Sequence, residues 1–203
     1  MHTVQRNLLA TLLSVTAVPL LAGTDPVRLA CGAEALASDA GCSLSDGRVS
    51  FVLQATSGSS LNSLAVTPRG LEHDSETRRV ELDGTAYLAE LADLDANGWP
   101  EVYVYVSSAG SGSYGSLAAY AVNNGKSATP VYLPPLEQTP ALADGYMGHD
   151  EFRVVENRLV RRFPLYGPAD TNADPSGGTR QLQYRLDAGE AGWVLVVDKV
   201  VEY

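Results

Sequence analysis

Short runs of strand-forming residues, each closed by turn residues, most constrain how this chain can fold. The clearest run is residues 102–106, Val-Tyr-Val-Tyr-Val, whose β-branched and aromatic side chains favour a strand. A loop of Ser, Ala and Gly around Tyr114 follows, and a second apolar run starts at Leu117. This order predicts strand, loop and strand, with a loop longer than an ordinary hairpin turn.

Comparable runs recur along the chain and are separated by Gly, Pro and Asn. Their spacing predicts an all-β fold, an antiparallel β-sandwich, with a barrel-like sandwich as the alternative. Asp83-Gly84 is a hairpin signal, residues 130–140 are too rich in proline for a central strand, and residues 29–39 are expected to hold one short helix. The other expected strands are residues 48–55, 64–66, 80–82, 86–91, 152–155, 159–163, 182–186 and 193–201.

The first residues have the order of a secretory signal peptide. Arg6 precedes an apolar run over residues 8–21, and the small residues Ala22 and Gly23 follow. The sequence therefore predicts a signal peptide over residues 1–22, an N-terminal tether over residues 23–45 and one β domain over residues 46–203.

The two cysteines agree with export. Cys31 and Cys42 are expected to form a disulfide in an oxidising compartment, where it would hold the tether in place. Arg28 occupies a position that an aliphatic residue takes before a lipidated cysteine, so lipidation of Cys31 is not expected. A periplasmic, unlipidated protein is the resulting expectation.

The charge of the chain restricts its partners. The formal net charge is −10, and removal of residues 1–22 takes away only Arg6 and leaves −11. An acidic surface argues against binding to nucleic acid or to anionic membranes. It would speed association with a basic protein, although acidity for solubility alone is an equally good explanation.

One turn carries a set of oxygen ligands. Asp93, Asp95 and Asn97 alternate, Gly98 follows, and Glu101 closes the pattern, which is how a calcium loop gathers oxygens. The spacing is shorter than in an EF-hand, so the preferred interpretation is an Asx-rich turn with no metal. Calcium is the alternative, and no cofactor is expected.

No motif predicts catalysis. Residues 110–115 match G-x-G-x-x-G, but the element that follows is too short for the helix of a dinucleotide site. No serine has glycines two residues away on both sides, and His149 and Asp150 are sequence neighbours that one backbone would have to splay into a relay. The chain is expected not to be an enzyme; a secreted hydrolase is the remaining catalytic alternative.

The sequence resembles the periplasmic inhibitors of invertebrate-type (i-type) lysozymes. The S-G-x-Y motif of that family is Ser111-Gly112-Ser113-Tyr114 in this chain. The similarity continues through residues 145–152, GYMGHDEF, and reaches most of the chain after Leu91.

The resemblance implies a periplasmic β-sandwich, often a homodimer, whose loop enters the active-site cleft of a lysozyme. Ser111, Gly112, Ser113 and Tyr114 are then the expected binding residues, and the expected secondary contacts are Tyr146, His149 and Arg161. A secreted carbohydrate- or cell-wall-binding module that uses Tyr114 and Trp99 is the alternative from another functional class.

Overall fold

The computed structural model describes residues 29–56 and 62–203. The expected signal peptide, the first part of the expected tether (residues 23–28) and residues 57–61 lie outside the described residues. None of the helices in the described ranges is long and apolar enough to cross a membrane.

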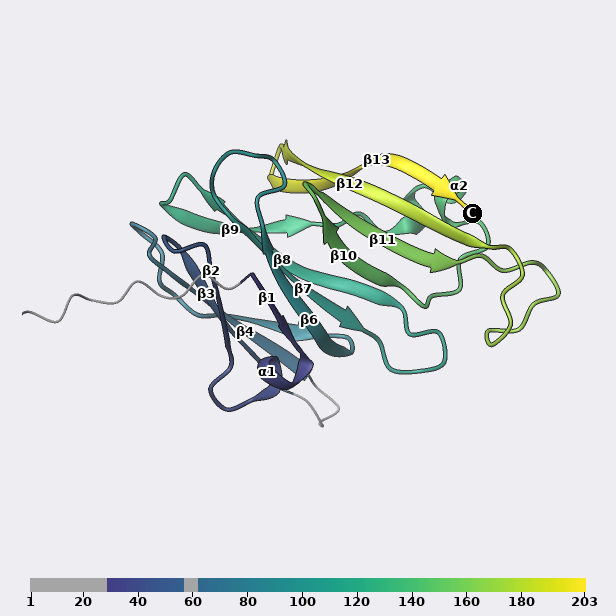
Figure 1. Cartoon of the computed structure of the whole chain (residues 1–203), viewed down its shortest axis with the longest axis horizontal. Helices are drawn as coiled ribbons and strands as arrows, with labels where there is room; N and C mark the ends of the chain where they lie inside the picture. Colours follow the sequence, from purple (N-terminus) through teal and green to yellow (C-terminus); the bar gives the residue numbers. More distant parts are fainter. Residues whose placement is uncertain (1–28, 57–61) are drawn as a thin grey trace, which may run out of the picture.

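The larger of two sheets has nine strands and curls so that its two halves face each other (Figure 1). Its neighbours are antiparallel except β9 and β13, which pair in parallel through two residue pairs. The strand order is β1-β6-β7-β8-β9-β13-β12-β11-β10. The bounds are β1 Ala30–Gly32, β6 Thr85–Ala92, β7 Glu101–Ser107, β8 Gly115–Asn123, β9 Ser127–Tyr132, β10 Glu151–Val155, β11 Arg158–Pro164, β12 Thr179–Gly189 and β13 Gly192–Glu202.

The smaller sheet is antiparallel and has four strands in sequence order. Its strands are β2 Cys42–Ser45, β3 Ser50–Ala55, β4 Asn62–Arg69 and β5 Arg78–Leu82. The described helices are short and lie in connections: α1 Ala33–Ala37, η1 Leu136–Gln138 and α2 Pro140–Ala143. The predicted all-β fold is confirmed.

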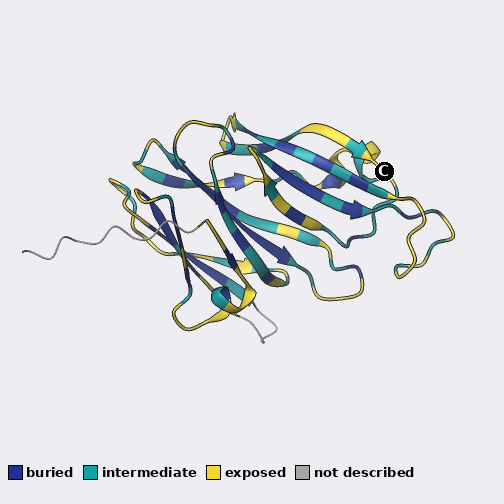
Figure 2. Ribbon diagram, viewed as in Figure 1, coloured by how far each residue is buried: buried dark blue, intermediate teal, exposed yellow. Residues whose placement is uncertain are grey.

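Strand β7 is buried along almost its whole length because each of its faces meets a different core (Figure 2). Val102 and Val104 pack into the core under the four-stranded sheet. Tyr103 and Tyr105 alternate with them and pack into the core formed with β10 to β13. Alternation of side chains along a strand therefore places β7 between two apolar layers.

The cysteines join the two sheets. Cys31 in β1 and Cys42 in β2 form the expected disulfide, and both side chains are buried. Residues 30–45, which the sequence interpretation treated as a tether, contribute β1 to the large sheet and β2 to the small one. The helix expected over residues 29–39 is limited to α1, because β1 occupies the residues before it.

The hairpin expected at Asp83-Gly84 is wrong. Strand β5 pairs with β4, whereas β6 pairs with β1 and β7, so this turn carries the chain from one sheet to the other. The Asn62 side-chain amide donates to the Gly84 carbonyl at 2.7 Å, and this bond holds the crossing in place. Asp83 and Gly84 do form a turn, but the turn connects two sheets instead of two paired strands.

The exclusion of residues 130–140 from a central strand is also wrong in part. Pro130 lies in β9, between β8 and β13. The first four residues of β9 pair with β8, and its last two residues, Val131 and Tyr132, pair with β13. The proline, which has no N–H to donate, therefore sits where the pairing changes from one neighbour to the other.

Candidate functional site

The loop at residues 108–114 connects β7 to β8 and projects from one end of the molecule (Figure 1). The Ser108 amide donates to the Tyr114 carbonyl at 2.9 Å and closes the loop at its base. Gly110 and Ser113 both have positive φ, 110° and 41°, so the backbone reverses tightly at the tip. The predicted strand, loop and strand are confirmed.

Two of the four expected binding residues are exposed. These are Ser111 and Tyr114, and the tyrosine is 48% exposed. Ser113 is half-buried and Gly112 is buried. Of these four residues, Ser111 and Tyr114 are therefore the ones most accessible to a partner.

Residues 145–150 lie behind the loop and hold its backbone. The His149 amide donates to the Gly112 carbonyl at 2.6 Å. Gly148 has a φ of 96°, and a side chain there would collide with the same carbonyl oxygen. The two stretches that carry the family resemblance, far apart in sequence, thus touch through their backbones.

A buried ion pair forms the floor under the loop. Arg161 Nε donates to Asp150 Oδ1 at 2.6 Å, and the two side chains are 5% and 0% exposed. Asp150 Oδ2 accepts from the Tyr146 hydroxyl at 2.5 Å and from the Gly115 amide at 2.6 Å. One carboxylate therefore connects β11, the 145–150 segment and the first residue of β8.

The protonated forms of Arg161 and Tyr146 are favoured in this cluster. Burial alone would lower the pKa of Arg161, but the Asp150 carboxylate outweighs burial and raises that pKa above its ordinary value. Burial raises the pKa of the Tyr146 hydroxyl, and Asp150 raises it further against the opposing charge of Arg161. The phenol therefore stays protonated and donates to Asp150.

Tyr114 rests on an aromatic stack. Its ring meets Tyr146 edge-on with centroids 5.5 Å apart, and Tyr146 meets Phe163 at 4.7 Å. The Arg161 guanidinium lies over the Tyr146 ring, 5.2 Å from its centroid. Edge-to-face contacts of this kind restrict ring orientation, so Tyr114 is held against Tyr146 while about half of it stays exposed.

A surface groove of about 380 Å³ opens beside Tyr114. Tyr132, which is 53% exposed, lines the same groove. The groove is mainly apolar, with Leu117 and Pro134 among its lining residues.

The expected secondary contacts have different positions. Tyr146 and Arg161 lie beneath the loop: Tyr146 packs against Tyr114, and Arg161 contacts Tyr146. The His149 ring points to the other side, where Nε2 is 3.0 Å from Asn172 Oδ1 and the ring stacks near Tyr166. Because the Asp150 carboxylate is engaged with Arg161, His149 and Asp150 face different partners.

The possible calcium residues also come together. Carboxylate oxygens of Asp93, Asp95 and Glu101 lie within 4.8 Å of one another, and Asn97 bonds to Asp95. Trp99, in the same turn, lies under Arg48, whose guanidinium is 4.8 Å from the ring centroid.

Sequence reasoning gave three residues too little weight. Asp150 was considered mainly as a catalytic candidate. Gly148 was not singled out, and Tyr132 was part of a proline-rich stretch. A signal for the first two existed, since both belong to the GYMGHDEF segment that carries the resemblance. No local signal marks Tyr132, because its groove depends on how β9 lies beside the loop.

Comparison of the chain with models of protein families, with curated proteins and with solved structures gives no match.

Proposed function

We propose that the chain is a periplasmic inhibitor of i-type lysozyme that inserts Ser111, Gly112, Ser113 and Tyr114 into the active-site cleft of the enzyme. The observation that carries this proposal is the combination of an exposed Tyr114 with a backbone held from behind by residues 145–150. A loop ordered before binding loses little conformational entropy when it enters a cleft.

The chemistry of a lysozyme cleft matches what the loop displays. Such enzymes hydrolyse glycosidic bonds with two carboxyl groups in a cleft shaped for sugar rings. The Ser111 hydroxyl is able to hydrogen-bond a carboxyl group, and the exposed Tyr114 ring suits a subsite where a sugar ring stacks. The acidic net charge favours encounter with a basic enzyme.

An inhibition assay against purified i-type, c-type and g-type lysozymes tests the proposal. The wild-type protein should inhibit the i-type enzyme. Tyr114→Ala should weaken that inhibition by at least about 2 kcal/mol, because interface energy concentrates in desolvated aromatic anchors. Ser111→Ala should cost less, roughly 1–2 kcal/mol, since it removes one hydrogen bond to a carboxyl group.

Tyr203→Ala is the matched control, because Tyr203 is another exposed tyrosine, 67% accessible at the C-terminus. It should inhibit as the wild type does, and all three variants should keep the wild-type Tm. If Tyr114→Ala and Ser111→Ala fold and inhibit like the wild type, the loop is not the inhibitory element.

One observation favours a second candidate, a carbohydrate- or cell-wall-binding module. Tyr114 and Tyr132 line the same groove, as aromatic side chains do in sugar sites. Trp99 does not belong to this groove. It precedes β7 while Tyr114 follows it, and seven residues of strand at about 3.4 Å each separate them by roughly 24 Å. Retention on insoluble peptidoglycan that is lost in Tyr132→Ala would support this candidate.

The periplasmic location is part of the proposal. The Cys31–Cys42 disulfide is compatible with an oxidising compartment. Cell fractionation followed by intact-mass analysis, with and without reductant, tests both the location and the start of the mature chain.

A further inference from the structure

Three carboxylates converge in the turn between β6 and β7. Oxygens of Asp93, Asp95 and Glu101 all lie within 4.8 Å of one another. Asp93 is exposed, Asp95 is half-buried and Glu101 is fully buried. Within residues 29–56 and 62–203, none of the three forms an ion pair with a basic side chain.

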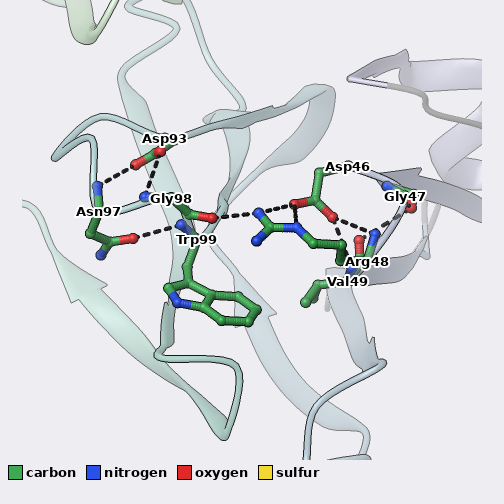
Figure 3. A network of polar contacts seen from close by, with 9 residues as sticks. Asp46, Gly47, Arg48, Val49, Asp93, Asn97, Gly98 and Trp99 are labelled. Atoms are coloured by element: carbon green, nitrogen blue, oxygen red, sulfur yellow. Dashed lines mark hydrogen bonds and ion pairs between the residues drawn. The ribbon is translucent and has the colours of Figure 1, made fainter.

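The turn has its own hydrogen bonds, several of which are drawn in Figure 3. Asp93 accepts from the amides of Asn97 and Gly98 at 3.0 and 2.9 Å, and Asp95 accepts from the Asn97 side chain at 2.8 Å. Ala96 and Gly98 have φ of 56° and 83°, which closes the turn. These bonds explain the shape of the turn and do not by themselves require a ligand.

Glu101 provides the independent evidence, because half of its carboxylate has no partner. Oε2 accepts from the Leu94 amide at 2.7 Å and from the Tyr103 hydroxyl at 3.4 Å. Oε1 is buried and has no hydrogen-bond partner among the described residues. A buried carboxylate oxygen without a partner is costly, and here the neighbouring charges are negative as well.

The pKa of Glu101 reflects the same buried and acidic surroundings. Burial, with the nearby carboxylates of Asp95 and Asp93, raises the pKa of Glu101 to about 8 against the opposing Leu94 hydrogen bond. The geometry alone favours an added cation, because three carboxylates converge without a basic partner and the buried Glu101 Oε1 has no hydrogen-bond donor among the described residues.

We propose that Asp93, Asp95, Asn97 and Glu101 bind one Ca²⁺ ion. All the donors are hard oxygens, which Ca²⁺ prefers, and their irregular arrangement suits its flexible coordination better than the strict octahedron of Mg²⁺. Asn97 Oδ1 accepts from the Trp99 amide at 2.7 Å and keeps a second lone pair for the ion. This proposal replaces the sequence-based preference for a metal-free turn.

The last proposed ligand, Glu101, comes from the start of a strand, whereas the last glutamate ligand of an EF-hand precedes a helix. Glu101 follows Gly98 by three residues and is the first residue of β7, so its side chain returns to the turn from the adjacent sheet. A bound ion would anchor the strand whose other end carries the 108–114 loop. Extracellular calcium modules have Kd values of roughly 10⁻⁴–10⁻³ M, and we expect this site to fall in that range.

Calorimetric titration with CaCl₂ and thermal melts in CaCl₂ or in chelator test the site. The wild-type protein should bind one Ca²⁺ saturably, and its Tm should rise with Ca²⁺ concentration and fall back with chelator. MgCl₂ should shift the Tm much less than CaCl₂. NaCl at matched ionic strength controls for simple screening of the acidic surface.

Glu101→Gln should weaken Ca²⁺ binding at least about tenfold, because it removes a charged ligand. Glu190→Gln, the same substitution in the exposed β12–β13 turn, should bind as the wild type does. Asp95→Asn is the second variant if Glu101→Gln does not fold. The absence of saturable binding in the wild type, equal Tm shifts with NaCl, or unchanged Ca²⁺ affinity in both site variants would overturn the proposal.

Discussion

At the scale of single residues, glycines decide how closely two segments approach. A side chain at Gly112 would meet the ring of Tyr114, with the closest ring carbon at 2.5 Å. Gly148 has positive φ and faces the Gly112 carbonyl from the other side. Gly112 leaves room for the Tyr114 ring and Gly148 leaves room for the Gly112 carbonyl, and together they set where Tyr114 stands.

Gly148→Ala should therefore lower the free energy of unfolding by about 1–3 kcal/mol, because it combines an unfavourable φ with a collision against backbone. It should also weaken lysozyme inhibition, since the 108–114 loop has to move away. Urea denaturation and the inhibition assay measure the two effects.

Gly192→Ala is the control for this variant. Gly192 also has positive φ, 140°, but the nearest atom to an added side chain is the Pro130 carbonyl oxygen at 3.8 Å. It should lose less stability and leave inhibition unchanged. Equal inhibition by Gly148→Ala and the wild type would show that residues 145–150 do not position the loop.

At the scale of elements, the β10–β11 hairpin supports the 108–114 loop from beneath. Arg161 in β11 and Asp150 just before β10 are buried together, and Asp150 also holds the first amide of β8. A carboxylate that satisfies an arginine, a phenol and a backbone amide at once leaves three groups unpaired when it is removed.

Asp150→Asn should destabilise the protein by about 3–5 kcal/mol, because it leaves the Arg161 charge buried without its partner. Asp198→Asn is the matched control, because the pairing of Asp198 with Arg158 is about one-third exposed. That variant should cost about 0–1 kcal/mol. Similar unfolding free energies for the two variants would mean that the buried pair is not a structural support.

At the scale of the whole molecule, polar clamps add to the apolar cores that join the sheets. Asp74, in the connection before β5, accepts from the Ala128 amide of β9 at 2.9 Å and pairs with Arg78 of β5 at 2.5 Å. Arg78 also donates to the Ala128 carbonyl at 3.1 Å. The clamp thus ties the edge of the small sheet to the middle of the large one.

This clamp should make stability depend on pH in the acid range. Burial alone would raise the pKa of Asp74, but bonds from Arg78 and Ala128 outweigh burial and hold that pKa below its usual 3.8. The folded state thus favours the charged form of Asp74. Its contribution to the free energy of unfolding is complete above about pH 3.8 and is lost as the pH falls through the lower pKa of the folded state.

Unfolding free energies measured by urea between about pH 5 and pH 2.5 test this linkage. Asp74→Asn should lose stability near neutral pH and show a shallower fall toward low pH than the wild type. Arg78→Met should flatten the same part of the curve, since it removes the main partner. Parallel curves for the wild type and both variants would contradict the assignment.

The sequence by itself determined the features that depend on neighbours along the chain. Alternating β-branched and aromatic residues predicted most strands, turn residues predicted the β7–β8 and β10–β11 hairpins, and two cysteines allowed a single intramolecular disulfide. The Ser111–Tyr114 motif could likewise be placed on a projecting loop, because the strand before it and the small residues within it are local signals.

Tertiary structure decided the features that depend on contacts between distant residues. Asp83-Gly84 looked like a hairpin because a turn signal does not say which sheet the next strand joins. Pro130 looked unsuited to a central strand because its place at a change of pairing depends on β13, about sixty residues later. The support under Tyr114 and the burial of Glu101 also depend on tertiary contacts. Burial and electrostatics are set by the segments that pack over a residue, and its neighbours in the sequence do not specify those segments.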